Sequence, residues 1–80
     1  MIRVISFLKI EFGMSKTIIK MLKNIPEVVK ILNTTGETDI IIELEGESPE
    51  ALSYIYFEKI DPIPGMKEIH SHYVLSVWEK

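Results

Sequence analysis

The chain has 80 residues and a formal net charge of −3, and 46% of its residues are hydrophobic. A chain of this length forms one domain, residues 1–80, that buries roughly 60% of its unfolded surface, so a lone monomer is only marginally stable. Cysteine is absent, which excludes disulfides and thiol chemistry. Association with further copies is then the common way to stabilise so small a fold. The slight acidity argues against direct nucleic-acid binding and against a polybasic membrane anchor.

The sequence carries no targeting or membrane signal. No apolar run approaches the roughly 20 residues that a membrane-spanning helix needs. The N-terminal stretch lacks the long apolar core and the small-residue cleavage site of a signal peptide. These features predict a cytoplasmic protein.

The first half of the chain predicts a strand, a helix and two further strands. Residues 2–12 alternate as a strand whose even positions form one apolar face, interrupted only by Ser6. Residues 15–25 carry apolar side chains at spacings of 3 and 4, with Ser15 as the expected N-terminal cap and Pro26 as the stop. Strands follow over 27–35 and 38–45.

The second half repeats the pattern of helix and strand. Ser48 followed by Pro49 is a strong start signal for a helix over residues 49–60. A long final strand is expected over 66–78. The order is therefore β-α-β-β-α-β, in which two right-handed strand-helix-strand units interleave. We predict an α+β, ferredoxin-like sandwich with an antiparallel sheet in the order 4-1-3-2 and both helices on one face.

Three apolar residues lie on the face of the sheet that the helices leave uncovered. They are Ile5 and Phe7 on the first strand and Ile41 on the third, the two central strands of the predicted order. Exposed apolar patches on small domains mark interaction surfaces. We therefore expect two copies to dimerise through their sheet faces, which would contribute about 1.5–3 kcal/mol for each side chain buried. The alternative is that these residues are scattered surface hydrophobes.

Catalytic and metal-binding motifs are nearly absent. His70 and His72 project from one face of the last strand, but a metal site would need at least one more ligand. No metal site and no cofactor are predicted. The pair also raises the possibility of a pH-sensitive association, because histidine titrates near neutrality.

One loop between the second and third strands suggests ligand binding. It has the sequence Thr34-Thr35-Gly36-Glu37-Thr38-Asp39. Backbone N–H groups beside a glycine hold carboxylates, and Asp39 would hold an ammonium group, so the loop suits a free amino acid. An ordinary polar turn explains the same residues.

Three short motifs, in order and at these intervals, resemble a known family. They are Ile25-Pro26-Glu27-Val28, the run from Thr35 to Ile40, and Ile63-Pro64-Gly65-Met66. The chain resembles the C-terminal effector domain, or RAM domain, of the Lrp/AsnC transcription regulators. The resemblance runs from the first strand to Leu75.

The resemblance implies a function and a site. Family members dimerise through their sheets, often join into rings of eight or ten subunits, and bind amino acids where dimers meet. Gly36, Glu37, Thr38 and Asp39 correspond to the ligand-binding loop. Ser71 matches a hydroxyl position of the last strand, whereas Ile69 replaces the other. The chain begins at the effector domain, so it resembles the stand-alone versions that lack the helix-turn-helix domain. Such a domain would either sense metabolites directly or co-assemble with full-length regulators.

Three hypotheses follow. The first is a non-enzymatic domain that oligomerises and binds an amino-acid effector, with a role in transcription regulation. The second is a pure assembly module without effector, which the substitution at Ile69 favours. The third is a small dimeric ferredoxin-like enzyme that uses His70, His72 and Tyr73. Bulky residues expected between the helices and the sheet argue against the open pocket that such an enzyme needs: Phe12, Met21, Leu22 and Tyr56.

Overall fold

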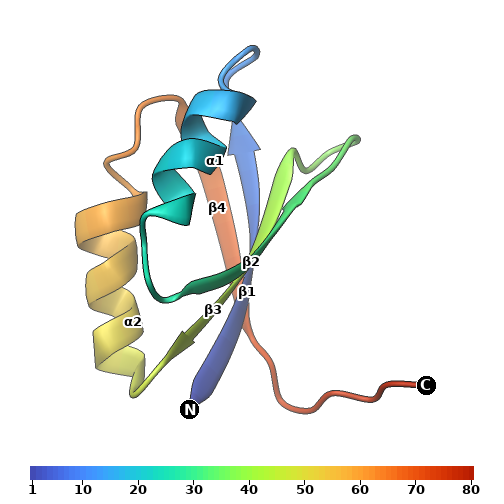
Figure 1. Cartoon of the computed structure of the whole chain (residues 1–80), viewed down its shortest axis with the longest axis vertical. Coiled ribbons are helices and arrows are strands. Elements are labelled where there is room, and N and C mark those ends of the chain that lie inside the picture. Colours follow the sequence, from blue (N-terminus) through green and yellow to red (C-terminus); the bar gives the residue numbers. More distant parts are fainter.

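The computed structural model describes all 80 residues and has the predicted order of elements. A π-helical segment, Tyr56–Ile60, directly continues the second helix. The remaining elements are β1 (Ile2–Ile10), α1 (Ser15–Lys23), β2 (Val28–Asn33), β3 (Ile40–Gly46), α2 (Pro49–Ile55) and β4 (Met66–Tyr73) (Figure 1).

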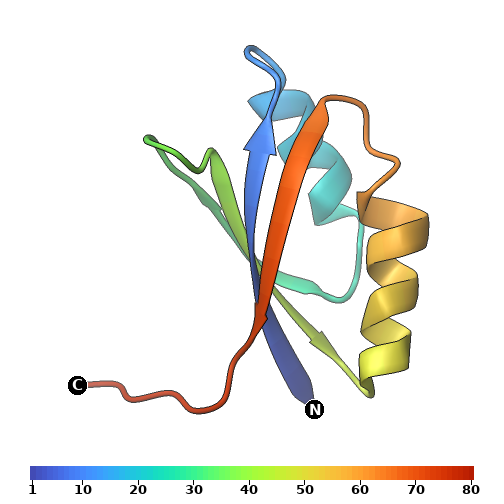
Figure 2. The same ribbon diagram turned by 180° about the vertical axis from the view of Figure 1, so that it is seen from behind.

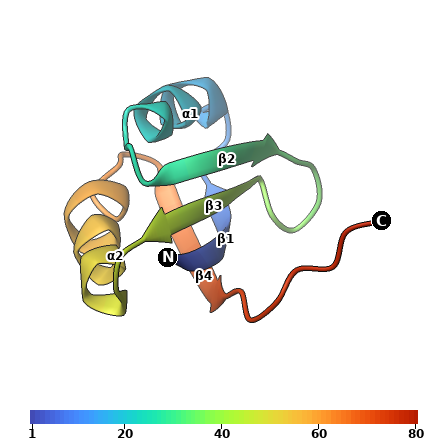
Figure 3. The same ribbon diagram turned by 60° about the horizontal axis from the view of Figure 1, so that its bottom comes forward.

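The sheet has the predicted topology. Its order is β2-β3-β1-β4, which is 4-1-3-2 from the other edge, and all neighbouring strands are antiparallel. Ser6, near the middle of β1, lies opposite Ile42 of β3 and Ser71 of β4. Both helices cover the same face of the sheet (Figures 1 and 3). The other face is open, and we call it the open face below.

The core lies between the helices and the inward side of β1 and β3. Every second residue of each central strand is buried, as a half-covered sheet requires. Ser6 is fully buried among these apolar residues. The buried apolar side chains are Val4, Leu8, Ile10, Ile18, Leu22, Ile25, Ile40, Ile42, Leu44, Leu52, Ile55, Ile60 and Ile63.

The predicted N-terminal capping residue is correct for α2 but not for α1. The Ser48 side chain caps α2 by accepting a 3.1 Å hydrogen bond from Ala51 N, and Pro49 occupies the first turn, as predicted. In α1 the capping position falls on Met14, whose side chain makes no capping bond. The prediction that Ser15 caps this helix is therefore wrong, because Ser15 is already its first helical residue.

The first strand is shorter than predicted, and Phe12 is not a core residue. The β1–β4 register shifts between Lys9 and Ile10, and the chain then turns through Gly13, where φ is +84°. Beyond the shift the alternation no longer holds Phe12 against the helices, and its side chain is fully exposed. Met21 is 39% exposed at the rim of α1, so it does not fill the core either.

The last strand also ends earlier than predicted, at Tyr73 rather than at residue 78. Tyr73 lies opposite Val4, and Val74 N still donates a 2.9 Å hydrogen bond to Arg3 O. Because β1 begins at Ile2, the chain beyond Val74 has almost no neighbouring backbone left to pair with. Residues 74–80 therefore leave the sheet as an extended tail (Figure 2). No helix of the protein is long and apolar enough to cross a membrane.

Truncating a core side chain tests this architecture. We expect Ile42→Ala to lower the free energy of unfolding by about 2–5 kcal/mol, because the cavity beneath the fully buried side chain cannot be refilled. Val29→Ala, at an exposed position of the edge strand β2, should change it by less than about 0.5 kcal/mol. Urea denaturation measures both, and equal losses would contradict the assigned core.

Candidate functional site

The loop between β2 and β3 is closed by its own backbone. Thr34 N donates to Asp39 O at 2.9 Å, and Thr34 Oγ1 donates to Thr38 O at 2.8 Å. Gly36 has φ +110°, which a side chain would strain, and no atom lies within 4 Å of the place a Cβ would take. Gly36 and Glu37 are exposed, so the loop offers free backbone groups to a ligand.

Asp39, which was predicted to bind a ligand, has a structural role in the fold. Its backbone N donates to Leu8 O at 3.0 Å, and its carboxylate Oδ2 accepts a 2.9 Å hydrogen bond from Ile10 N. The residue therefore fastens the start of β3 to the end of β1, where the register of β1 shifts. The second carboxylate oxygen, Oδ1, is left for another donor.

Ser71 belongs to a partly buried hydroxyl network whose other members, Ser6 and Tyr56, were not predicted to lie in a site. Ser71 Oγ lies 2.7 Å from Ser6 Oγ, and Ser6 Oγ is also hydrogen-bonded to the hydroxyl of Tyr56. The three groups link β1, β4 and the π-helical segment. Ser6 was visible in the sequence as the single interruption of an apolar face, and that interruption was the available signal.

The hydroxyl network lies beside a cavity at the free edge of β4. The cavity has a volume of about 170 Å³, and its lining residues are Val4, Leu52, Ser53, Tyr56, Ser71, His72 and Tyr73. No carboxylate, lysine or arginine lines it. Such a hollow suits a small group that both packs against apolar atoms and makes hydrogen bonds.

Tyr56 is held in its neutral form. Burial raises the pKa of the Tyr56 hydroxyl above its usual value, and the hydrogen bonds from Ser6 and Ser71 only partly oppose this effect. The hydroxyl therefore remains a proton donor throughout the physiological range.

The loop and the cavity are separate within one copy of the chain. The cavity contains none of residues 36–39. Glu37 and Thr38 border a different hollow, of about 310 Å³, with Lys9 and Glu68. Ser71 pairs with Ser6, whereas Asp39 lies beyond the level of Leu8 on the far side of β1. One copy thus does not bring the predicted ligand-binding residues together.

The open face carries the predicted apolar residues and a fourth that was missed. Ile5, Phe7 and Ile41 are half-buried, and Leu32 of β2, opposite Ile41, is 47% exposed. We call these four residues the apolar patch. Leu32 was missed because the alternation of β2 is broken by an irregularity between Val28 and Lys30.

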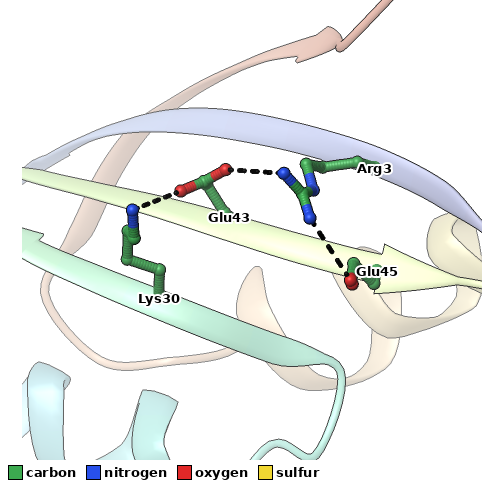
Figure 4. Close-up of polar contacts among 4 residues, drawn as sticks. All are labelled: Arg3, Lys30, Glu43 and Glu45. Atoms are coloured by element: carbon green, nitrogen blue, oxygen red, sulfur yellow. Dashed lines mark ion pairs between the residues drawn. The ribbon is translucent and has the colours of Figure 1, made fainter. Parts of the chain in front are cut away.

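Charged side chains border the apolar patch on the same face. Arg3 reaches Glu43 at 3.9 Å and Glu45 at 3.6 Å, and Lys30 reaches Glu43 at 3.4 Å (Figure 4). Each such surface pair contributes at most about 1 kcal/mol. These pairs neutralise charges on one side of the patch, whereas Lys9 and Glu37, which border a hollow with Phe7, are in no ion pair.

The two histidines lie on the open face but form no metal site. The His70 ring is 3.2 Å from Glu68 Oε1, and the His72 ring packs edge-on against Phe7 with centroids 5.7 Å apart. No group of three or more His, Asp or Glu side chains is placed to hold a metal ion. Tyr73, the third residue of the enzyme hypothesis, lies opposite Val4 on the helix-covered side; it lines the cavity beside β4 together with His72, whereas His70 borders the other hollow.

The raised pKa of Tyr56 predicts how stability depends on pH. Because the unfolded chain loses this proton first, the stabilisation is complete below about pH 10, the ordinary tyrosine value, and disappears as pH rises through the higher folded pKa. We expect Tyr56→Phe to lower the free energy of unfolding by about 0.5–1.5 kcal/mol at neutral pH and by less at high pH. Tyr54→Phe, at an exposed tyrosine, is the control. Chemical denaturation between pH 7 and 11 measures this, and identical profiles for the two variants would contradict it.

Comparison with known proteins adds evidence for the fold. The chain is 28% identical over 67 residues to the HTH-type transcriptional regulator FL11 of Pyrococcus horikoshii, which covers 84% of this chain and 44% of that protein. It thus spans less than half the length of this relative. The crystal structure of FFRP-DM1 superposes with a TM-score of 0.89 at 21% identity, covering 94% of this chain and all of that one.

A second solved structure has the same fold. It is a transcriptional regulator from Neisseria meningitidis in complex with L-Met, with a TM-score of 0.89 at 18% identity, covering 99% of this chain and 53% of that one. A family model described as the Lrp/AsnC ligand binding domain matches residues 3–80. This match spans nearly the whole chain and confirms the resemblance found in the sequence, so the protein belongs to the Lrp/AsnC ligand binding domain family.

Proposed function

We propose that this chain is a non-enzymatic effector domain that dimerises through its open face and binds an amino acid where two dimers meet. The single observation that supports this most strongly is the hydroxyl-lined cavity between α2 and β4, which opens at an edge of the sheet and has no carboxylate, lysine or arginine in its lining. The description of the family as a ligand binding domain agrees with it, and the similar Neisseria regulator was solved with L-Met.

The site would be completed by two copies. The cavity with Ser71 offers packing and hydroxyl groups, whereas the Gly36–Asp39 loop offers backbone N–H groups and a carboxylate. Since these halves are apart in one copy, a loop from a neighbouring dimer would bring the groups that hold an α-carboxylate and an α-ammonium to the cavity. Ligand binding and assembly would then be thermodynamically linked, as in rings of eight or ten subunits.

The lining of the cavity defines the class of effector. Apart from His72, the lining has no ionisable group that pairs with a charged side chain at neutral pH, because it contains no carboxylate, lysine or arginine, and burying an unpaired charge is costly. We therefore propose a neutral amino acid. By assembling with full-length regulators related to FL11, the domain would alter their binding to DNA without contacting DNA itself.

A pure assembly module is the second candidate. Ile69, which replaces a hydroxyl residue of the family, packs against the core, and Asp39 is partly engaged by Ile10 N. Both observations reduce the groups available to an effector. In this case the chain would oligomerise and show no response to amino acids.

A thermal-shift screen with the twenty amino acids distinguishes these candidates. We expect neutral amino acids to raise the melting temperature and charged ones to leave it unchanged. At a concentration about 100 times the dissociation constant, the stabilisation would be about 2.7 kcal/mol. No response at millimolar concentration, together with an unchanged oligomer, would contradict effector binding and favour the assembly module.

Asp39→Asn isolates the charge of the loop. An asparagine keeps a side-chain oxygen that accepts from Ile10 N but cannot pair with an ammonium group. We expect this variant to fold normally and to lose at least about tenfold in amino-acid affinity, because a charge-assisted hydrogen bond contributes about 1.5–3 kcal/mol. Asp61→Asn, at an exposed carboxylate elsewhere, is the control. Equal amino-acid affinity of the two variants would show that Asp39 does not bind the ligand.

Dimerisation through the open face is tested with a charge in the apolar patch. We expect Ile41→Lys to weaken the dimer about 100-fold or more, because a symmetric interface would lose two apolar contacts and gain two buried charges. Thr17→Lys introduces the same residue at an exposed position of α1 and should have no effect. Sedimentation velocity measures both dissociation constants, and a wild-type protein that stays monomeric would refute the proposed interface.

A further inference from the structure

The C-terminal tail, residues 74–80, exposes large apolar side chains that the chain itself does not cover. Leu75 is 96% exposed, Trp78 90% and Val77 55%. Only the hydrogen bond from Val74 N to Arg3 O ties the tail to the sheet. A groove of about 720 Å³, lined by Met1 and Ile2 on one side and by Leu75 and Val77 on the other, separates the tail from the start of β1.

The direction of the tail points to the side on which a partner would lie. It leaves the end of β4 and extends away from the helices, past the open face (Figures 2 and 3). The same strand carries His72, whose ring contacts Phe7 of the apolar patch. The tail is therefore continuous with the surface proposed for dimerisation.

The length of the tail is sufficient to reach a partner. Two sheets that pack face to face are about 10 Å apart. At about 3.3–3.6 Å per residue, residues 74–80 extend up to roughly 25 Å, more than twice that spacing. In a sheet-to-sheet dimer the tail of each copy would have to pass alongside the other copy.

We infer that residues 74–80 form a strap that packs Leu75, Val77 and Trp78 against a second copy of this chain. The inference rests on the proposed dimer, because only a copy seated on the open face lies within reach. By symmetry each copy gives one strap and receives one. The strap would bury exposed apolar area at the rim of the interface and so slow the dissociation of the dimer.

Trp78 is the only tryptophan of the chain and reports directly on the strap. We expect its emission to shift to shorter wavelength, and acrylamide quenching to fall at least twofold, as the protein is concentrated from monomer to dimer. Sedimentation at the same concentrations measures the fraction of dimer. A dimer with Trp78 equally quenched would overturn the strap while leaving the dimer intact, and shielding of Trp78 already in the monomer would overturn it as well.

A variant pair separates the strap from general surface hydrophobicity. We expect Leu75→Ser to raise the dimer dissociation constant at least tenfold, since both straps lose an apolar contact. Phe57→Ser alters a side chain that is 73% exposed on the helix-covered side and should leave the constant unchanged. Equal constants for Leu75→Ser and the wild type would refute the strap, and absence of any dimer would refute the strap together with the dimer on which it rests.

Discussion

The constraint on which the structure depends is that two helices cover only one face of a sheet whose central strands are apolar on both. β1 and β3 bury alternate residues beneath the helices, and these residues make up much of the core. Their other residues include Ile5, Phe7 and Ile41, which water reaches in a single copy. Burying these exposed apolar residues against another copy would therefore add hydrophobic stabilisation to a marginally stable fold.

The one polar interruption of the core coincides with the candidate ligand site. A buried hydroxyl without a partner costs free energy, and Ser6 avoids that cost by bonding to both Tyr56 and Ser71. These bonds keep the junction between α2 and the π-helical segment at a fixed position against β1 and β4. The cavity beside them is consequently a preformed feature of the fold, with its hydroxyl groups already oriented.

The other half of the candidate site depends on backbone geometry. Gly36 adopts a positive φ that side chains disfavour, and Asp39 joins two strands through its carboxylate. The loop is therefore held rigidly at its base while its tip remains open. The loop and the cavity lie apart in one copy, so the proposed site would be completed only when copies assemble. A regulator with such a site would respond to its effector through a change in its oligomeric state.

The order of elements, the sheet topology and three of the four residues of the apolar patch could be predicted from the sequence, because alternation with period 2 and stripes with period 3.6 report directly on which face each residue occupies. Contacts between segments that are distant in the sequence could not be predicted in this way. Local pattern did not reveal that Ser6 meets Tyr56 and Ser71, since 50 and 65 residues separate them along the chain. The ends of β1 and β4 were misplaced for the same reason: apolar residues continue in the sequence, but a register shift and the lack of a neighbouring strand end the pairing. Strand length is decided by the partner backbone, which only the tertiary structure supplies.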